Sequence, residues 1–115
     1  MNKVYYLKTC NTCIRILKEL NLSSKFVLQD IKEESLTVKQ LEELHKLSGS
    51  YEALFSKRAK LYKEMDLKNT NLRERDYKHY ILEHYTFLQR PVIVIENTIF
   101  IGNSKKVVEA VKQKL

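Results

Sequence analysis

Residues 3–13 carry the sequence Lys-Val-Tyr-Tyr-Leu-Lys-Thr-Cys-Asn-Thr-Cys, and this stretch decides the fold that we predict. Its first part, Lys3 to Leu7, is rich in β-branched and aromatic residues and is typical of a short strand. The polar residues that follow end the strand and lead into two cysteines. Apolar residues at helical spacing come next, at Ile14, Leu17 and Leu20. The stretch therefore predicts a strand, a turn that carries cysteines, and a helix.

A second strand is predicted directly after this helix. Asn21 and the Ser23-Ser24 pair end the helix, and Phe26 to Gln29 then has strand character. A strand, a helix and a second strand form a βαβ unit, whose crossover is right-handed and whose strands are parallel.

The middle of the chain is predicted to be helical. Thr37 and Gln40 have the spacing of a capping box at the start of a helix. Ser48-Gly49-Ser50 interrupts that helix, and two short helical pieces follow over Tyr51–Phe55 and Ala59–Met65.

A further helix is predicted after Asn71, which has cap spacing with Glu74. Its apolar stripe runs to the next break in the pattern and consists of Tyr77, Tyr80, Ile81, His84 and Leu88.

The last part of the chain predicts a hairpin and a helix. Pro91 opens the continuous apolar run Val92–Ile95, which suits a strand that is buried on both faces. The polar pair Glu96-Asn97 leads into a second strand over Thr98–Ile101. Ser104 is placed to cap a final helix, whose apolar face consists of Val107, Val108 and Val111.

Length and composition predict one globular domain. The chain has 115 residues, of which 43% are hydrophobic and 30% charged, with two glycines and one proline. The net charge of +7 favours anions in general but lacks a dedicated basic tail, so we expect no direct nucleic-acid partner. The longest apolar run is far shorter than the ~18 residues of a membrane span, and no signal peptide is evident. We therefore expect a cytoplasmic protein with no membrane partner.

The cysteine pair is the main candidate for chemistry. Cys10 opens a helix, where free N–H groups and the positive end of the helix dipole favour a thiolate over a thiol. Cys13 lies within one helical turn, so its sulfur can attack a mixed disulfide on Cys10 and release the reduced product. We interpret Cys10 as the nucleophile and Cys13 as the resolving thiol.

Two alternatives to this interpretation stay open at the level of the sequence. The cysteines could be ordinary small core residues, or they could form half of a zinc site. The histidines His79 and His84 are more than sixty positions away and are spaced unlike those of compact zinc modules, so we predict no metal site.

The residues around the proline are the next candidates. Pro91 either adopts a cis bond beside the thiol or merely starts a strand. Arg90 is placed to hold an oxyanion or to stabilise the thiolate by charge-assisted hydrogen bonds, and Arg58 either faces the thiol or faces water. We group these two arginines with Asn11 and Thr12, which lie between the cysteines, as candidate residues for binding an anion or substrate.

These elements and motifs, in this order, resemble the arsenate reductase family of the thioredoxin-like fold. Cys10-x-x-Cys13, Ser56-x-Arg58 and Arg90-Pro91 are especially similar to the Spx-type branch of that family. The resemblance runs from about Lys3 to Lys112 and implies an α/β fold with a thioredoxin-like, or glutaredoxin-like, mixed sheet. We expect a single domain over residues 1–115 with a helical insertion at about residues 36–88, between the βαβ and ββα halves.

The resemblance also implies a chemistry. It implies a cis Pro91, a reactive Cys10, and an anion bound by Arg90. In glutaredoxin-coupled arsenate reductases, the cysteine attacks arsenate, glutathione attacks the adduct, and glutaredoxin clears the mixed disulfide. The implied partners are a small oxyanion or glutathione and a glutaredoxin- or thioredoxin-type reductant, with no bound cofactor.

This sequence differs from the arsenate reductases at three kinds of position. Cys13 adds a second cysteine to the turn, and a histidine upstream of the reactive cysteine corresponds to Tyr6. Two further anion-binding arginines of the family fall at Ser56 and Asn103.

The Spx-type branch implies an alternative function. Regulators of that type use the two cysteines as a redox switch and bind the C-terminal domain of the RNA polymerase α subunit near a loop glycine. Gly49 is the candidate for that glycine. The two hypotheses are thus a thiol oxidoreductase of the arsenate reductase type and a transcription regulator that senses the redox state.

Overall fold

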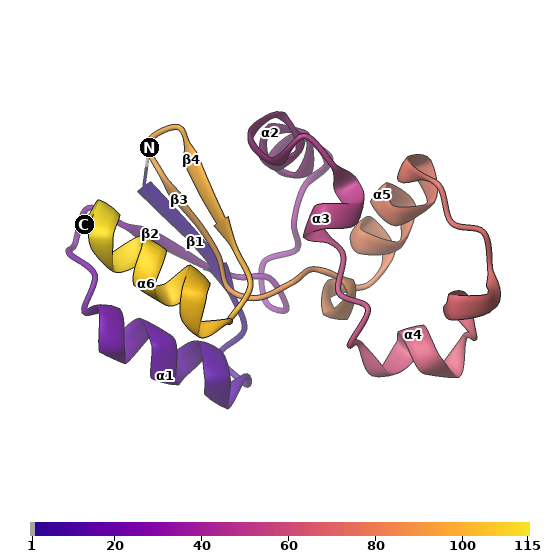
Figure 1. The fold of residues 1–115 in the computed structure, drawn as a ribbon, viewed down its shortest axis with the longest axis horizontal. Helices are drawn as coiled ribbons and strands as arrows, with labels where there is room; N and C mark the ends of the chain where they lie inside the picture. The colour runs from indigo at the N-terminus through magenta and orange to yellow at the C-terminus, as the bar shows by residue number, and fades with distance from the viewer. Residues whose placement is uncertain (1) are drawn as a thin grey trace. The chain divides into compact units, whose positions relative to one another are not determined.

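The computed structural model describes residues 2–115, which form two compact units (Figure 1). The sheet unit comprises residues 2–35 and 90–115, and the helical unit comprises residues 36–89. The sheet unit contains β1 (Asn2–Tyr6), α1 (Asn11–Leu20), β2 (Val27–Asp30), β3 (Val92–Ile95), β4 (Thr98–Ile101) and α6 (Lys105–Lys114). The helical unit contains α2 (Val38–Ser48), α3 (Tyr51–Leu54), α4 (Lys60–Glu64), η1 (Leu67–Asn69), α5 (Glu74–Glu83) and η2 (Tyr85–Phe87).

The four strands form one mixed sheet in the order β2-β1-β3-β4. β1 and β2 are parallel, with Lys3 opposite Val27, and the connection between them is α1. β3 is antiparallel to both β1 and β4, and the β3–β4 pair is a hairpin that turns at Glu96, whose φ is +55°. The predicted α/β class, the parallel βαβ unit and the hairpin are confirmed.

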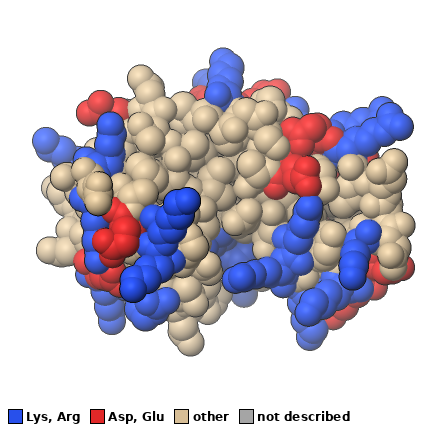
Figure 2. Space-filling view, viewed as in Figure 1, with Lys and Arg blue, Asp and Glu red and all other residues tan. Residues whose placement is uncertain are grey.

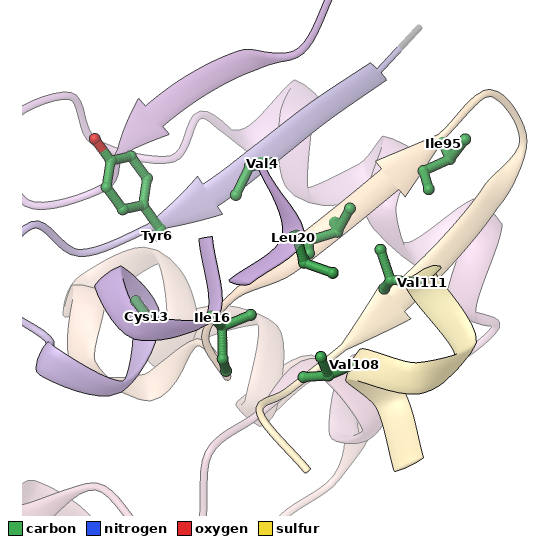
Figure 3. Close-up of a cluster of buried hydrophobic side chains, with 9 residues drawn as sticks. Val4, Tyr6, Cys13, Ile16, Leu20, Ile95, Val108 and Val111 are labelled. Atoms are coloured by element: carbon green, nitrogen blue, oxygen red, sulfur yellow. The ribbon is translucent and has the colours of Figure 1, made fainter. Parts of the chain in front are cut away.

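The core of the sheet unit lies between one face of the sheet and the two helices α1 and α6 (Figure 3). All four residues of β3 are buried, as the unbroken apolar run predicts. Ser104 caps α6 by accepting a hydrogen bond from the Val107 N–H at 3.2 Å, which is the predicted cap. The buried cluster consists of Val4, Tyr6, Cys13, Ile16, Leu20, Ile93, Ile95, Val108 and Val111.

The buried face of α1 differs from the predicted stripe. Cys13, Ile16 and Leu20 are buried, whereas Ile14 and Leu17 are only half-buried at the margin of the core. Positions 13, 16 and 20 follow the same three-and-four spacing as the predicted stripe, rotated around the helix. The predicted stripe ran through Ile14, Leu17 and Leu20, whereas the face that includes Cys13 is the one that is buried.

The start of the helical unit follows the prediction. Thr37 Oγ1 accepts the Gln40 N–H at 3.0 Å, and Gln40 Oε1 accepts the Thr37 N–H at 3.1 Å, so the capping box is present. α2 ends at Ser48, and Gly49 follows with a φ of +77°, a conformation that a side chain would strain.

The expected cap at Asn71 and Glu74 is wrong. α5 begins at Glu74, and it is Asp76 that accepts the Arg73 N–H, at 2.8 Å. The Glu74 carboxylate instead accepts the N–H groups of Tyr51 and Glu52 at the start of α3, at 2.7 and 3.0 Å. A carboxylate satisfies the free N–H groups of any nearby helix, and cap spacing within the sequence does not reveal a partner that is more than twenty residues away.

The last predicted stripe of the helical unit is also interrupted. α5 ends at Glu83, and His84 is extended, with its Nδ1 accepting the Thr86 N–H at 3.2 Å. The turn η2 then buries Phe87, which stacks on Phe55 with ring centroids 5.1 Å apart. The His84 imidazole thus accepts the Thr86 N–H, which a backbone carbonyl would accept if the helix continued.

Within residues 2–115, no helix has the length and apolar character that a membrane span requires. On the face shown in Figure 2, basic side chains are interspersed with acidic ones and with uncharged surface.

The rotated face of α1 leads to a test of stability. Ile16 is 1% exposed and faces the sheet, so Ile16→Ala removes core contacts and leaves a cavity. We expect it to lower the free energy of unfolding by about 2–5 kcal/mol in urea denaturation.

The matched control is Ile14→Ala, in the same helix. Because Ile14 is half-buried, we expect a loss of about 1–2 kcal/mol. Equal losses for the two variants would contradict the orientation of α1 described above.

Candidate active site

The turn between β1 and α1 holds Cys10 directly before the first residue of the helix. The Leu7 carbonyl accepts the Cys10 N–H at 3.1 Å, and the Cys10 carbonyl accepts the Ile14 N–H at 3.1 Å. Cys10 is therefore the N-cap of α1, with extended backbone angles of φ −93° and ψ 106°. Its side chain is partly buried against the core of the sheet unit.

The surroundings of Cys10 are electropositive. α1 starts directly after Cys10, and its first turn contains no acidic residue that would neutralise the positive end of the helix dipole. Asn11 is exposed and Thr12 is half-buried in that turn. The N–H groups of a first helical turn have no acceptor within the helix, so they are available to an anion held at the Cys10 end of α1.

Cys13 lies one turn further and is fully buried, with 0% of its surface exposed. The pKa of the Cys13 thiol is raised to about 12, chiefly by burial and in addition by the neighbouring Cys10 sulfur, while the Leu7 backbone and Arg90 oppose the change. Cys13 is therefore a neutral thiol in the folded, reduced protein at neutral pH.

The pKa of Cys10 moves in the opposite direction. Partial burial opposes ionisation, but the backbone N–H and thiol of Cys13, together with the charge of Arg90, outweigh it and lower the pKa of Cys10. The two sulfurs thus form a complementary pair, in which Cys10 is the group that ionises and Cys13 is the group that donates.

Arg90 and Pro91 lie beside the cysteines in the sheet unit. The Arg90–Pro91 peptide bond is cis, and the buried Pro91 directly precedes β3. The Pro91 carbonyl accepts the Gly102 N–H at 2.9 Å, which ties this segment to the end of β4. Arg90 is half-buried, and its guanidinium interacts with the Cys10 sulfur by charge and by hydrogen bonding.

Four predicted companions of Cys10 belong to the same unit, and one belongs to the other unit. Cys10, Cys13 and Arg90 meet in the sheet unit, at the turn that Asn11 and Thr12 complete. Arg58 belongs to the helical unit, where it is exposed in the turn before α4. A role for Arg58 at the thiol stays a prediction.

Sequence analysis missed one contributor to the site, the backbone of Leu7. Its carbonyl holds the Cys10 N–H, and its backbone also interacts with the Cys13 sulfur. A backbone group leaves no signature in the residue type. The burial of Cys13 did have a signal, since it shares helical spacing with Ile16 and Leu20.

Within residues 2–115, no three histidine, cysteine or acidic side chains gather as ligands for a metal ion. The sheet topology and the cysteine turn define a class of protein: a thioredoxin-like protein with a thiol of lowered pKa at the start of its first helix. The sequence model of the ArsC family matches residues 5–111. The chain belongs to the ArsC family.

Solved structures share this fold. An ArsC family related protein from Bacteroides fragilis superposes with a TM-score of 0.77 at 22% identity, covering 96% of each chain. The arsenate reductase from Vibrio cholerae superposes with a TM-score of 0.77 at 21% identity, covering 99% of this chain and 97% of that one. An ArsC-related protein from Brucella melitensis has a TM-score of 0.71 at 19% identity, covering 95% of this chain and 92% of that one.

A comparison with curated protein sequences found no match. Family membership supports a thiol-based, arsenate-reductase-like function, and the superpositions show the fold.

The interaction between Arg90 and Cys10 leads to a prediction about reactivity. Arg90→Gln removes a positive charge that stabilises the thiolate, so we expect the pKa of Cys10 to rise. The rate of alkylation by iodoacetamide then falls at neutral pH and recovers at alkaline pH. Peptide mass spectrometry of the reduced protein across a pH series measures this rate at Cys10.

The control is Lys18→Gln, which removes one positive charge from the last turn of the same helix. We expect this variant to keep the wild-type pH profile. A profile that Arg90→Gln leaves unchanged would contradict the placement of Arg90 beside the thiol.

The raised pKa of Cys13 leads to a prediction about stability. Between pH 9 and 12 the unfolded chain releases the Cys13 proton while the folded chain keeps it, since burial raises the pKa from 9.0 to about 12. This group therefore adds no pH dependence below pH 9. Above pH 9 we expect it to reduce the free energy of unfolding by up to about 1.4 kcal/mol per pH unit.

The measurement compares Cys10→Ser with Cys10→Ser/Cys13→Ala, because neither variant can form the disulfide. The first variant keeps the buried Cys13 thiol, whose pKa burial raises, and the second variant lacks that thiol. We expect the single variant to lose stability more steeply with pH in urea denaturation. Parallel curves would show that Cys13 ionises in the folded protein as readily as in the unfolded one.

Proposed function

We propose that this chain is a cytoplasmic thiol oxidoreductase of the arsenate reductase type, which reduces an oxyanion or a disulfide at the expense of glutathione. The proposal is carried by one observation: Cys10 has a lowered pKa, and the fully buried Cys13 beside it has a raised one. A low pKa supplies the attacking thiolate at neutral pH, and a neutral thiol next to it does not compete for the substrate.

In the first step of the proposed cycle, the Cys10 thiolate attacks the substrate. With an oxyanion, the sulfur displaces one oxygen, which leaves as water or hydroxide. Glutathione then attacks the adduct, so that two thiols give up one electron each and the central atom is reduced by two. The products are the reduced oxyanion and a mixed disulfide between Cys10 and glutathione.

The incoming anion is held by the positive charge of Arg90 and by the free N–H groups at the start of α1. Asn11 and Thr12 contribute to this turn, and Arg58 is a further candidate cation. Ser56 and Asn103, at positions where the arsenate reductases carry arginines, add no charge. The anion site proposed here therefore depends on Arg90 more than the sites of those enzymes do.

In the last step, Cys13 resolves the mixed disulfide. Its sulfur attacks the Cys10 sulfur, glutathione leaves as a thiolate, and a Cys10–Cys13 disulfide remains for a glutaredoxin- or thioredoxin-type dithiol to reduce. The charge and hydrogen bonding of the Cys10 thiolate help to raise the pKa of Cys13. Once Cys10 is bound to glutathione, that contribution is gone, so Cys13 becomes easier to ionise when its attack is required.

The proposal predicts different failures for the two cysteine variants. We expect Cys10→Ser to lose turnover on the order of 10³-fold or more, because no other thiolate replaces the nucleophile. We expect Cys13→Ser to accumulate the glutathione adduct on Cys10 and to depend on added glutaredoxin. Turnover is followed through NADPH consumption with glutathione reductase, using arsenate and 2-hydroxyethyl disulfide as substrates, and adducts are counted by mass spectrometry.

Turnover retained by Cys10→Ser would refute the proposal. A second outcome would favour the alternative function: a Cys10–Cys13 disulfide that forms reversibly without catalytic turnover. On that alternative the candidate contact is Gly49, which follows α2 with a φ of +77° and where an added Cβ would meet nothing within 4 Å. Binding to the RNA polymerase α C-terminal domain that differs between the reduced and oxidised protein would then identify a redox-sensing regulator.

A further inference from the structure

A cleft separates α1 from α6 on the outer side of the sheet unit, beside the helix that carries both cysteines. Its volume is about 260 Å³. Ile16 and Val108 contribute apolar surface, and charged side chains of both helices line the rest. In Figure 1, α1 and α6 lie side by side and begin at the same end of the sheet unit.

The acidic side chains of the cleft are already paired. Lys112 Nζ lies 2.6 Å from Glu19 Oε2 and 3.5 Å from Glu109 Oε1, so one lysine joins the two helices at the far end of the cleft. Figure 2 shows acidic side chains flanked by basic ones over this part of the molecule.

The basic side chains of the cleft have no such partner. Within residues 2–115, no carboxylate forms a salt bridge with Arg15 or with Lys105. Both side chains line the cleft, and their charges add to the main effect of Lys112 in lowering the pKa of Glu19. The cleft therefore has two cations to offer to an incoming anion, and together with Lys112 they outnumber its two carboxylates by one.

The position of these cations matches the reach of a small peptide thiol. Arg15 precedes Glu19 in α1, and Lys105 precedes Glu109 in α6, so both cations lie at the end of the cleft nearer to Cys10. Five residues separate Cys10 from Arg15, which is about 8 Å along a helix axis. The sulfur of glutathione is about two residue lengths, roughly 7 Å, from a terminal carboxylate.

We infer that the cleft between α1 and α6 binds a terminal carboxylate of glutathione, through Arg15 and Lys105, while the glutathione sulfur meets Cys10. The inference rests on the proposed function, and it assigns the recognition of the thiol substrate to residues outside the cysteine turn. The first turn of α6 also supports the inference. The Ser104 side chain accepts only the Val107 N–H of that turn, so the N–H groups before it are available to a carboxylate.

The test uses one reaction with two disulfides in a Cys13→Ser background. The Cys10 thiolate attacks one sulfur of oxidised glutathione, forms a mixed disulfide and releases one glutathione thiolate. With 2-hydroxyethyl disulfide, the same exchange releases mercaptoethanol thiolate, and no carboxylate takes part. The rate constant of each reaction is followed by mass spectrometry.

We expect Arg15→Ala/Lys105→Ala to slow the reaction with oxidised glutathione about tenfold, because two charge-assisted contacts are lost. The reaction with the uncharged disulfide should change by less than about twofold, since Cys10 and Arg90 are untouched. Lys18→Ala/Lys106→Ala removes two exposed lysines of the same two helices and should leave both rates within about twofold of the starting protein.

Equal slowing with both disulfides would overturn the inference, because the substitutions would then have disturbed the thiol itself. Equal slowing by the two pairs of substitutions would also overturn it, because general attraction by the basic surface would suffice. If Cys10 reacted with neither disulfide, the proposed function would fail together with the inference.

A binding measurement separates the two claims. S-methylglutathione carries the same carboxylates but cannot exchange, so it reports on the cleft without any thiol chemistry. We expect it to shift the backbone amide resonances of Arg15 and Lys105 in two-dimensional NMR spectra, and the shifts to vanish in the double variant. The absence of shifts in a protein that still turns over glutathione would overturn the inference and leave the proposed function intact.

Discussion

The burial of Cys13 against the sheet is the constraint on which the chemistry of this protein depends. The side chain has no exposed surface, so its thiol keeps its proton and is held next to the Cys10 sulfur. The same position makes Cys13 part of the core, between Ile16 and the strands. One residue therefore does two things: it completes the packing of α1, and it stabilises the thiolate one turn earlier in the chain. This arrangement explains why the two sulfurs of a short motif differ so strongly in acidity.

The residues of this chemistry belong to one of the two compact units of the chain, the sheet unit. The cysteines, Arg90 and the cis Arg90–Pro91 bond all lie in the sheet unit, although about ninety residues of sequence separate the first strand from the hairpin. The helical unit has its own core, in which Phe55 stacks on Phe87. It also has its own polar contact, in which the Glu74 carboxylate accepts hydrogen bonds from N–H groups at the start of α3.

The sequence was sufficient to predict the sheet and much of the site, because each of those features depends on short-range patterns. The run Val92–Ile95 is uniformly apolar and is buried on both faces, and Thr37 with Gln40 encodes a cap within four residues. The features that could not be predicted depend on distant partners. Glu74 caps a helix more than twenty residues away, and His84 ends a helix by bonding to its own neighbour, Thr86. The buried face of α1 was predicted through Ile14, Leu17 and Leu20. That stripe leaves out Cys13, which shares the buried face with Ile16 and Leu20.

The charges of the sheet unit show how a strongly basic chain can avoid a uniform positive surface. Lys112 of α6 forms a salt bridge with Glu19 of α1 and another with Glu109 of its own helix. One lysine therefore joins the two helices. Exposed pairs of this kind add little to stability, about 0–1 kcal/mol each. They also affect the distribution of charge along the cleft: among its lining residues, Arg15 and Lys105 form no salt bridge within residues 2–115, and both precede the paired glutamates of their helices. Since helix dipoles place their positive ends there as well, the two cations and the two dipoles add to a positive potential at the start of both helices.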